Sequence, residues 1–283
     1  MSTSPPNRLA APPDRAGSTH VRRGRFLTRA VLTLGLLGIG LAEVRPAAAT
    51  EPVTVFDLSH EPDTPAGDPL QAWLKGRSGR WEVKFGTPAY FFLRDGSLHL
   101  LARPGPMAGS VLFWRLLKRE DKVLLRVTAG GFRVHPQELR HLEVTMAPVQ
   151  LVGKGADVTD PDRNDACFYL LVSFDGPRHS YQGQRIPDTV AYVWADGAWK
   201  VAGEVGKERK YGEFMRYIAL GRGNDRPGQL RTLVRDVEAD FRLAYPERAA
   251  AGVPDVIEVG LMIDSNTVKS EAESRVRSVR FLP

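Results

Sequence analysis

The stretch Asp165-Ala166-Cys167-Phe168-Tyr169-Leu170-Leu171-Val172-Ser173-Phe174-Asp175 decides the fold. Eight of its nine interior residues are apolar, and a carboxylate closes each end. A run this short and this apolar predicts a β-strand that is buried on both faces. Its aromatic and β-branched residues also suit a pleated surface better than a helix. We therefore expect shorter strands to pair around it.

Segments on both sides of this run also have the pattern of strands. The clearest signal is a hairpin, in which Asp95-Gly96 separates residues 90–94 from residues 97–102 and supplies the positive φ of a tight turn. Residues 229–244 differ, because their apolar residues recur at helical spacing: Leu230, Leu233, Val234, Val237, Phe241 and Ala244. About ten strands and one amphipathic helix near residues 229–244 predict a mainly β fold, a jelly-roll-like β-sandwich.

The first 49 residues have the pattern of an export signal that follows a disordered, Pro-rich extension. An Arg-rich segment (residues 22–29) precedes an apolar one (residues 30–42), and Ala47-Ala48-Ala49 offers a cleavage site. The apolar segment is shorter than the about 20 residues that span a membrane. We expect cleavage, no stable membrane anchor afterwards, and a periplasmic or secreted β-sandwich domain over residues 50–283. An uncleaved anchor is the alternative, and both the Sec and the twin-arginine route stay open.

The charge balance argues against a nucleic-acid partner. The chain has a formal net charge of +6, but residues 1–49 carry seven of its 39 basic and two of its 33 acidic residues. The remainder has 32 basic and 31 acidic residues, a net charge of +1, so the compositional support for nucleic-acid binding is lost. The single cysteine, Cys167, excludes an intramolecular disulfide and is expected in the core. The oligomeric state stays open.

Two features are candidates for ligand binding. Asp264, Asn266 and Thr267 follow an alternating segment and offer carboxylate, amide and hydroxyl groups, which suit a sugar diol or a hard cation. The alternative is an Asx turn that only closes a strand. Trp199 stands beside a turn, and an exposed indole there would stack on a sugar ring.

A third feature resembles the beginning of a calcium loop. Asp160, Asp162 and Asp165 place carboxylates in one short loop, with Asp157 nearby. Asp165 and Leu171 stand where an EF-hand needs Gly and Glu, which excludes that motif. A looser Ca²⁺ site and a set of solvated carboxylates remain the two alternatives, and no other cofactor is expected.

No catalytic motif is found in the sequence. A Gly-x-Ser-x-Gly elbow is lacking, and His135 and His141 stand six apart rather than at the zincin spacing. Glycoside hydrolysis needs two carboxylates facing one cleft, for which Glu271 and Glu273 are a generic pair. Whether the protein is an enzyme therefore stays open.

From Trp81 onward the order of elements resembles a family of exported bacterial proteins known as domain of unknown function 3047. Four stretches carry the likeness: Arg163-Asn164-Asp165-Ala166, Ala191-Tyr192-Val193-Trp194, Arg235-Asp236-Val237 with Asp240-Phe241, and Gly260-Leu261-Met262-Ile263-Asp264-Ser265-Asn266-Thr267. The chain departs from the family in a shorter last turn, in Leu142-Glu143-Val144-Thr145-Met146 where the family has a paired tryptophan strand, and in its ending. The resemblance implies a β-sandwich and export, and it brings no established activity.

Together these features lead us to expect an exported, non-catalytic module that binds a glycan or another envelope polymer. The step from fold to function is an analogy. One alternative is a glycan-active hydrolase or lyase on the same sandwich, and another is a structural subunit of an envelope assembly. Two carboxylates in an aromatic-lined groove would favour the enzyme, whereas a flat aromatic face would favour binding.

Overall fold

The computed structural model describes part of one compact unit, Ala48–Pro283. The described residues are 50–65, 72, 81–85, 91–102, 109–115, 134–153, 155–160, 162–181, 184–195, 205–206, 213–223, 226–265, 267–268 and 270–283. The expected export signal lies outside them. Within these ranges, no helix is both long and apolar enough to cross a membrane.

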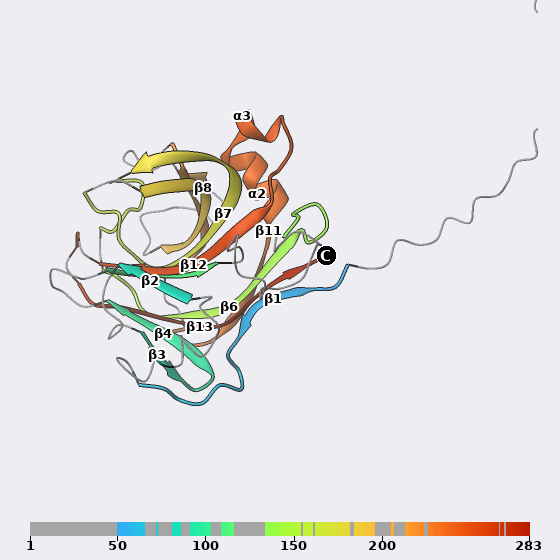
Figure 1. Ribbon diagram of the computed structural model, residues 1–283. Coiled ribbons are helices and arrows are strands. Elements are labelled where there is room, and N and C mark those ends of the chain that lie inside the picture. Colours follow the sequence, from blue (N-terminus) through green and yellow to red (C-terminus); the bar gives the residue numbers. More distant parts are fainter. Residues whose placement is uncertain are drawn as a thin grey trace, which may run out of the picture. The chain divides into compact units, whose positions relative to one another are not determined.

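Two sheets make up the fold (Figure 1). The six-stranded sheet has the order β11-β6-β13-β4-β3, with β1 also paired to β13. Its strands are β1 (Val53–Asp57), β3 (Phe91–Arg94), β4 (Ser97–Ala102), β6 (His141–Gln150), β11 (Arg231–Asp236) and β13 (Ala272–Leu282). The seven-stranded sheet has the order β2-β5-β12-β7-β8-β10-β9. Its strands are β2 (Trp81–Phe85), β5 (Gly109–Arg115), β7 (Ala166–Tyr181), β8 (Gln184–Ala195), β9 (Val205–Gly206), β10 (Met215–Arg222) and β12 (Val256–Asp264).

The two sheets lie face to face, and the chain crosses repeatedly from one to the other (Figure 1). Strands β5, β7 and β12 belong to the seven-stranded sheet, whereas β6, β11 and β13 belong to the other. All strand pairs are antiparallel except β8 with β10. This crossing pattern confirms the jelly-roll-like β-sandwich expected from the sequence.

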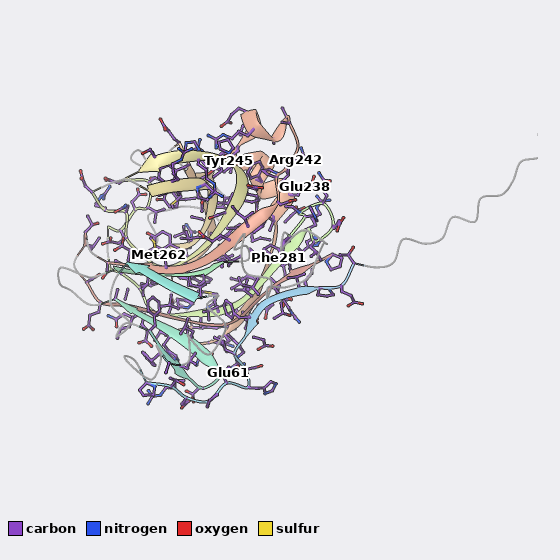
Figure 2. All side chains as sticks on the ribbon, viewed as in Figure 1. Glu61, Glu238, Arg242, Tyr245, Met262 and Phe281 are labelled. Atoms are coloured by element: carbon purple, nitrogen blue, oxygen red, sulfur yellow. The ribbon has the colours of Figure 1, made fainter. Side chains whose placement is uncertain are left out.

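The core between the sheets is filled by alternate residues of facing strands. Leu98 of β4, Val144 of β6 and Phe281 of β13 contribute from one sheet, and Phe168 and Val172 of β7 contribute from the other. All five are fully buried, and Phe281 is labelled in Figure 2. The central strand expected over residues 165–175 is therefore confirmed, and it continues to Tyr181 beyond an irregularity between Ser173 and Arg178.

The hairpin expected around Asp95-Gly96 is confirmed. Strand β3 ends at Arg94, which pairs with Ser97 at the start of β4. The turn residues have positive φ, 50° at Asp95 and 60° at Gly96. A Cβ atom at Gly96 would also lie 2.9 Å from the carbonyl oxygen of Ser59, so both the conformation and the space require glycine here.

The helix expected over residues 229–244 is present only in its second half. Helix α2 spans Val237–Ala244, whereas residues Arg231–Asp236 form β11 and pair with β6. The apolar spacing over residues 229–244 fits a helix, but Arg231 to Arg235 of β11 also alternate between half-buried and exposed positions. Pairing at the edge of β6 therefore overrides the helical spacing. Asp236 then starts the helix, and the short α3 (Pro246–Ala249) follows it.

Candidate functional site

Asp165 ties two of the candidate segments together at one end of the seven-stranded sheet. Its carboxylate is buried and accepts hydrogen bonds from the backbone N–H groups of Thr267 (2.9 Å) and Val268 (2.5 Å). Thr267 lies 102 residues further along the chain. Because hydrogen bonds to a carboxylate are stronger than neutral ones, they hold the turn after β12 against the start of β7.

Asn164 and Thr267 add a second connection between these segments. The Thr267 hydroxyl donates to the Asn164 side-chain oxygen (3.2 Å), and the Tyr169 hydroxyl donates to the Asn164 carbonyl oxygen (2.5 Å). Both Asn164 and Thr267 are half-buried, so their side chains remain partly accessible to solvent. The structure therefore presents an amide and a hydroxyl side by side in a fixed arrangement.

Asp264 lies at the same end of the seven-stranded sheet. It ends β12 and pairs with Ala166 of β7 and Gly109 of β5, and it is half-buried. Burial raises the pKa of the Tyr169 phenol, and the negative charges of Asp264 and Asp165 add to this effect. Tyr169 is therefore a protonated donor at neutral pH. We call the side chains of Asn164, Asp264 and Thr267 the polar rim.

An apolar cluster lies on the outer face of the seven-stranded sheet, away from the core. It contains Tyr169 of β7 and Tyr217 of β10, whose ring centroids are 6.4 Å apart. Met262 of β12 packs against it and marks its place in Figure 2. Because the Tyr169 hydroxyl donates a hydrogen bond to Asn164, this cluster also stabilises the position of the polar rim.

The other predicted metal ligands serve their own loop. Asp160 accepts hydrogen bonds from the Asp162 N–H (3.0 Å) and from Arg163 Nε (2.8 Å), and the same two contacts, in that order, lower its pKa. Asp157 likewise accepts from the N–H (3.0 Å) and the hydroxyl (2.6 Å) of Thr159. These are Asx turns, which need no ligand.

The predicted carboxylates are therefore not gathered around one point. Asp160 is engaged within its loop, Asp162 is exposed, and Asp165 faces the turn after β12. In the part of the chain that the structure describes, no group of three or more His, Cys, Asp or Glu residues is placed to hold a metal ion.

The aromatic candidate for stacking lies outside the described residues, as does Asn266. Among the five tryptophans, the structure describes the side chain of Trp194. That indole is buried, as expected for a core residue, and its Nε1–H donates to the Gly223 carbonyl oxygen (2.8 Å). Glu273, from the generic carboxylate pair, is engaged by His99 at 2.9 Å.

A buried ionic cluster at the opposite end of β7 was not indicated by the sequence. His179 Nε2 lies 2.9 Å from the Asp188 carboxylate, which also pairs with Arg248 of α3. Arg248 additionally donates to the Glu213 carbonyl oxygen (3.1 Å). Burial, and next the positive charge of Arg248, lower the pKa of His179. No local pattern relates these residues, because only the folded chain brings α3 beside β7 and β8.

Tyr245 stands at the centre of this cluster. Its hydroxyl lies 2.8 Å from the carbonyl oxygens of both Thr189 and Phe214, and it accepts a hydrogen bond from the Thr189 N–H (3.1 Å). The guanidinium groups of Arg216 and Arg248 lie 4.9 and 5.1 Å from its ring centroid. Tyr245 therefore fastens the end of α2 to β8 and β10.

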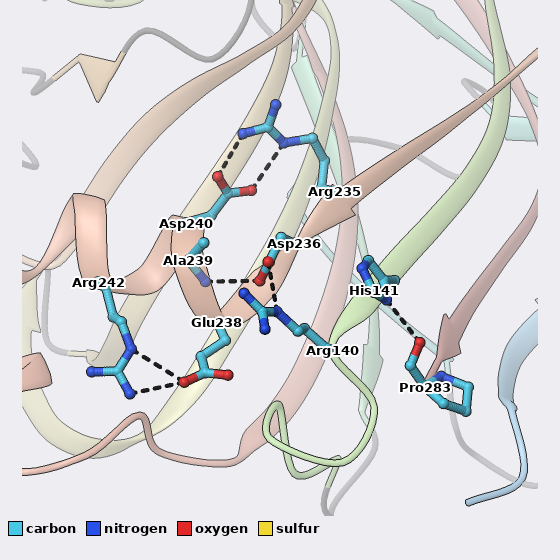
Figure 3. Close-up of polar contacts among 9 residues, drawn as sticks. All are labelled: Arg140, His141, Arg235, Asp236, Glu238, Ala239, Asp240, Arg242 and Pro283. Atoms are coloured by element: carbon cyan, nitrogen blue, oxygen red, sulfur yellow. Dashed lines mark hydrogen bonds and ion pairs between the residues drawn. The ribbon is translucent and has the colours of Figure 1, made fainter. Parts of the chain in front are cut away.

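The residues at the junction of β11 and α2 stabilise the fold through hydrogen bonds between their side chains and the start of the helix (Figure 3). Arg235 makes two hydrogen bonds to the Asp240 carboxylate, at 2.9 and 2.5 Å. Asp236 accepts from the Ala239 N–H (2.9 Å) and from Arg140 Nε (2.6 Å). These contacts fix the start of the helix, so this part of the family-like pattern maintains the fold.

Comparison with known proteins confirms the family resemblance for part of the chain. The model of the family "Protein of unknown function (DUF3047)" matches residues 148–280. This segment contains all three residues of the polar rim, and it also contains the ionic cluster. A search of curated proteins found no match.

A search of solved structures found several enzymes at low similarity. The native endo-1,4-β-glucanase CelB2 has a TM-score of 0.36 at 11% identity, over 72% of this chain and 93% of its own. A native family 12 xyloglucanase from Bacillus licheniformis has a TM-score of 0.35 at 11% identity, over 71% and 85%. Similarity at this level carries no information about ligand or reaction.

Proposed function

We propose that this protein is a non-catalytic binding module for a glycan or another hydroxyl-rich envelope polymer, and that the polar rim is its binding site. The observation that carries the proposal is the attachment of the turn after β12 to the start of β7. The Asp165 carboxylate makes this attachment through the N–H groups of Thr267 and Val268. A site whose groups are held in place before binding loses less conformational entropy when the ligand arrives.

The chemistry of the rim suits hydroxyl groups. The Asp264 carboxylate accepts hydrogen bonds, the Asn164 amide both donates and accepts, and the Thr267 hydroxyl does either. Sugars present donors and acceptors on adjacent carbons, and a row of such side chains matches them. The rim also lies in a loop region at the end of a sandwich, where scaffolds of this kind usually hold ligands.

Export belongs to the same proposal. An Arg-rich segment, an apolar segment and an Ala-rich site follow one another within residues 1–49. A protein delivered outside the cytoplasm meets envelope polysaccharides as its most abundant hydroxyl-rich ligands. A calcium ion at the rim is an additional proposal, which rests on the oxygen donors of Asp264 and Thr267.

A panel of immobilised glycans tests the binding role. The full-length chain is compared with the double variant Asp264→Ala/Asn266→Ala, with and without Ca²⁺. We expect the variant to lose glycan retention while its melting temperature stays nearly unchanged. If the turn is only structural, the same change should cost about 1–2 kcal/mol of stability and leave retention intact.

Asp57→Ala is the matched control. Asp57 also follows a strand and forms an Asx turn, accepting from the Ser59 N–H (3.0 Å) and hydroxyl (2.6 Å), but it ends β1 in the other sheet. Its loss should leave glycan retention unchanged. Reducing ends released from any glycan of the panel would replace the binding role with the hydrolase alternative.

A further inference from the structure

Arg216 is a buried cation without a buried carboxylate of its own. The residue is 7% exposed, and its Nη1 donates to the carbonyl oxygen of Met215 (3.4 Å). Among the residues that the structure describes, no carboxylate forms an ion pair with it. Arginine is almost never buried to this degree unless it is paired, because desolvating a charge is costly.

The surroundings of Arg216 add positive rather than negative charge. Arg248 lies over the same Tyr245 ring, so the two guanidinium groups are 4.9 and 5.1 Å from the centroid of one phenol ring. The buried carboxylate nearby, Asp188, is already shared between Arg248 and His179. Glu213 and Glu247 also face this region, but both are exposed to solvent, which screens their charge. Within the described part of the chain, one positive charge of the cluster is therefore unbalanced.

We propose that Arg216 and Arg248 form a binding site for an oxyanion group of a ligand: a carboxylate, sulfate or phosphate. The planar guanidinium group donates two parallel hydrogen bonds to such groups. Solvent reaches the cluster, since the Arg248 and His179 side chains are 25% and 16% exposed. An anion bound there would balance the charge of Arg216.

This anion site is separate from the polar rim. Asp264 pairs with Ala166 at the start of β7, whereas His179 pairs with Ile186 near the other end of that strand. The two sites therefore lie at opposite ends of β7. A protein that lacks the glycan site can still bind an anion here, and the reverse also holds.

His179 gives the anion site a pH dependence. Its lowered pKa keeps the ring neutral at neutral pH, and its Nε2–H donates a hydrogen bond to the Asp188 carboxylate. Acidification through that pKa adds a positive charge beside Arg216 and Arg248. Anion binding should therefore strengthen as the pH falls through the pKa of His179.

Melting curves and calorimetry of the full-length chain test the proposal. The probes are sodium sulfate, sodium phosphate and sodium glucuronate, each compared with sodium chloride at equal ionic strength. At about a hundredfold excess over Kd, a specific anion should raise the melting temperature by about 5 °C. The strongest of the three probes identifies which source of the oxyanion the site prefers.

Arg216→Met separates a ligand site from a structural cation. The variant should lose about tenfold or more in anion affinity, and without anions it should melt no lower than the wild type. Arg242→Met is the matched control, because Arg242 is an exposed arginine of helix α2 that pairs with Glu238 (2.8 Å; Figure 3). It should bind anions within about twofold of the wild type, the spread expected for surface changes.

Sulfate is the probe for the pH series, because its charge is constant between neutral and mildly acidic pH. Its affinity should increase on acidification in the wild type and stay nearly constant in His179→Gln. The proposal is overturned if none of the three anions stabilises the protein beyond chloride. It is equally overturned if Arg216→Met responds to them as the wild type does.

Discussion

At the scale of single residues, Phe168 is one of the large, fully buried side chains on which the fold depends. It is fully buried between the sheets, near the start of the strand that the sequence indicated first. Phe168→Ala should lower the free energy of unfolding by about 3–5 kcal/mol, because it removes apolar contacts and leaves a cavity. Urea denaturation measures the change.

Val234→Ala is the comparison for this prediction. Val234 is also an apolar strand residue, but it is 53% exposed. Its truncation should change the free energy of unfolding by less than about 0.5 kcal/mol. If Phe168→Ala lowers the free energy of unfolding by less than about 1 kcal/mol, Phe168 is not part of the packed core. That result would contradict the central position of β7.

Burial of single residues was largely predictable where it followed from a local pattern. The apolar run identified Phe168, and the position of Cys167 within that run indicated that its thiol would be buried, as it is. The role of Asp165 was not predictable, because its partners Thr267 and Val268 lie more than one hundred residues away. As a loop carboxylate it suggested a metal ligand, whereas in the structure it accepts backbone N–H groups.

At the scale of elements, Asp236 decides where β11 ends and α2 begins. Its carboxylate accepts the Ala239 N–H and the Arg140 side chain, and although burial opposes the effect, these contacts lower its pKa below 3.8. Asp236→Ala should cost about 1 kcal/mol at neutral pH, the usual loss for an N-cap. Chemical denaturation at several pH values measures it.

The sign of the pH dependence follows from the lowered pKa. A carboxylate whose pKa is lower in the folded than in the unfolded state stabilises the fold above the unfolded pKa. That contribution disappears as the pH falls through the lowered folded value. The stability difference between Asp236→Ala and the wild type should therefore be largest near neutral pH and vanish in acid. A difference that is independent of pH would show that Asp236 acts without its charge.

The elements themselves were predictable to different degrees. The turn residues Asp95 and Gly96 specified their hairpin, because few residues adopt positive φ at both positions. The apolar spacing over residues 229–244 was ambiguous, since Leu233 faces inward in a helix and in an alternating strand alike. Residues 231–236 form a strand because they pair with the edge of β6. The local sequence pattern does not show that β6 has an unpaired edge.

At the scale of the whole molecule, the two candidate sites show why sites are harder to predict than strands. A strand leaves a period of two in the sequence, so its existence is a local property. The polar rim joins Asn164 to Thr267, and the ionic cluster joins His179 to Arg248, across separate segments. Each connection depends on the order of strands in the seven-stranded sheet, where β12 lies beside β7 and β7 beside β8.

The last prediction concerns where the folded chain needs to begin. Strand β1 starts at Val53, which pairs with Phe281 of β13, and its buried residues include Val55 and Phe56. Cleavage after Ala49 would therefore leave every described strand intact, as an export signal requires. N-terminal sequencing of protein recovered outside the cytoplasm should begin near Thr50.

Two truncated chains test the same boundary by thermal melting. A chain of residues 50–283 should keep the melting temperature of the full-length protein, because no described strand is lost. A chain of residues 61–283 lacks β1 and uncovers part of β13, so several buried apolar side chains lose their contacts. It should melt at least about 5 °C lower, the shift expected for a loss of about 2 kcal/mol in a domain of this size. Recovery of the uncleaved chain from the cytoplasm alone would contradict export, whatever the melting curves show.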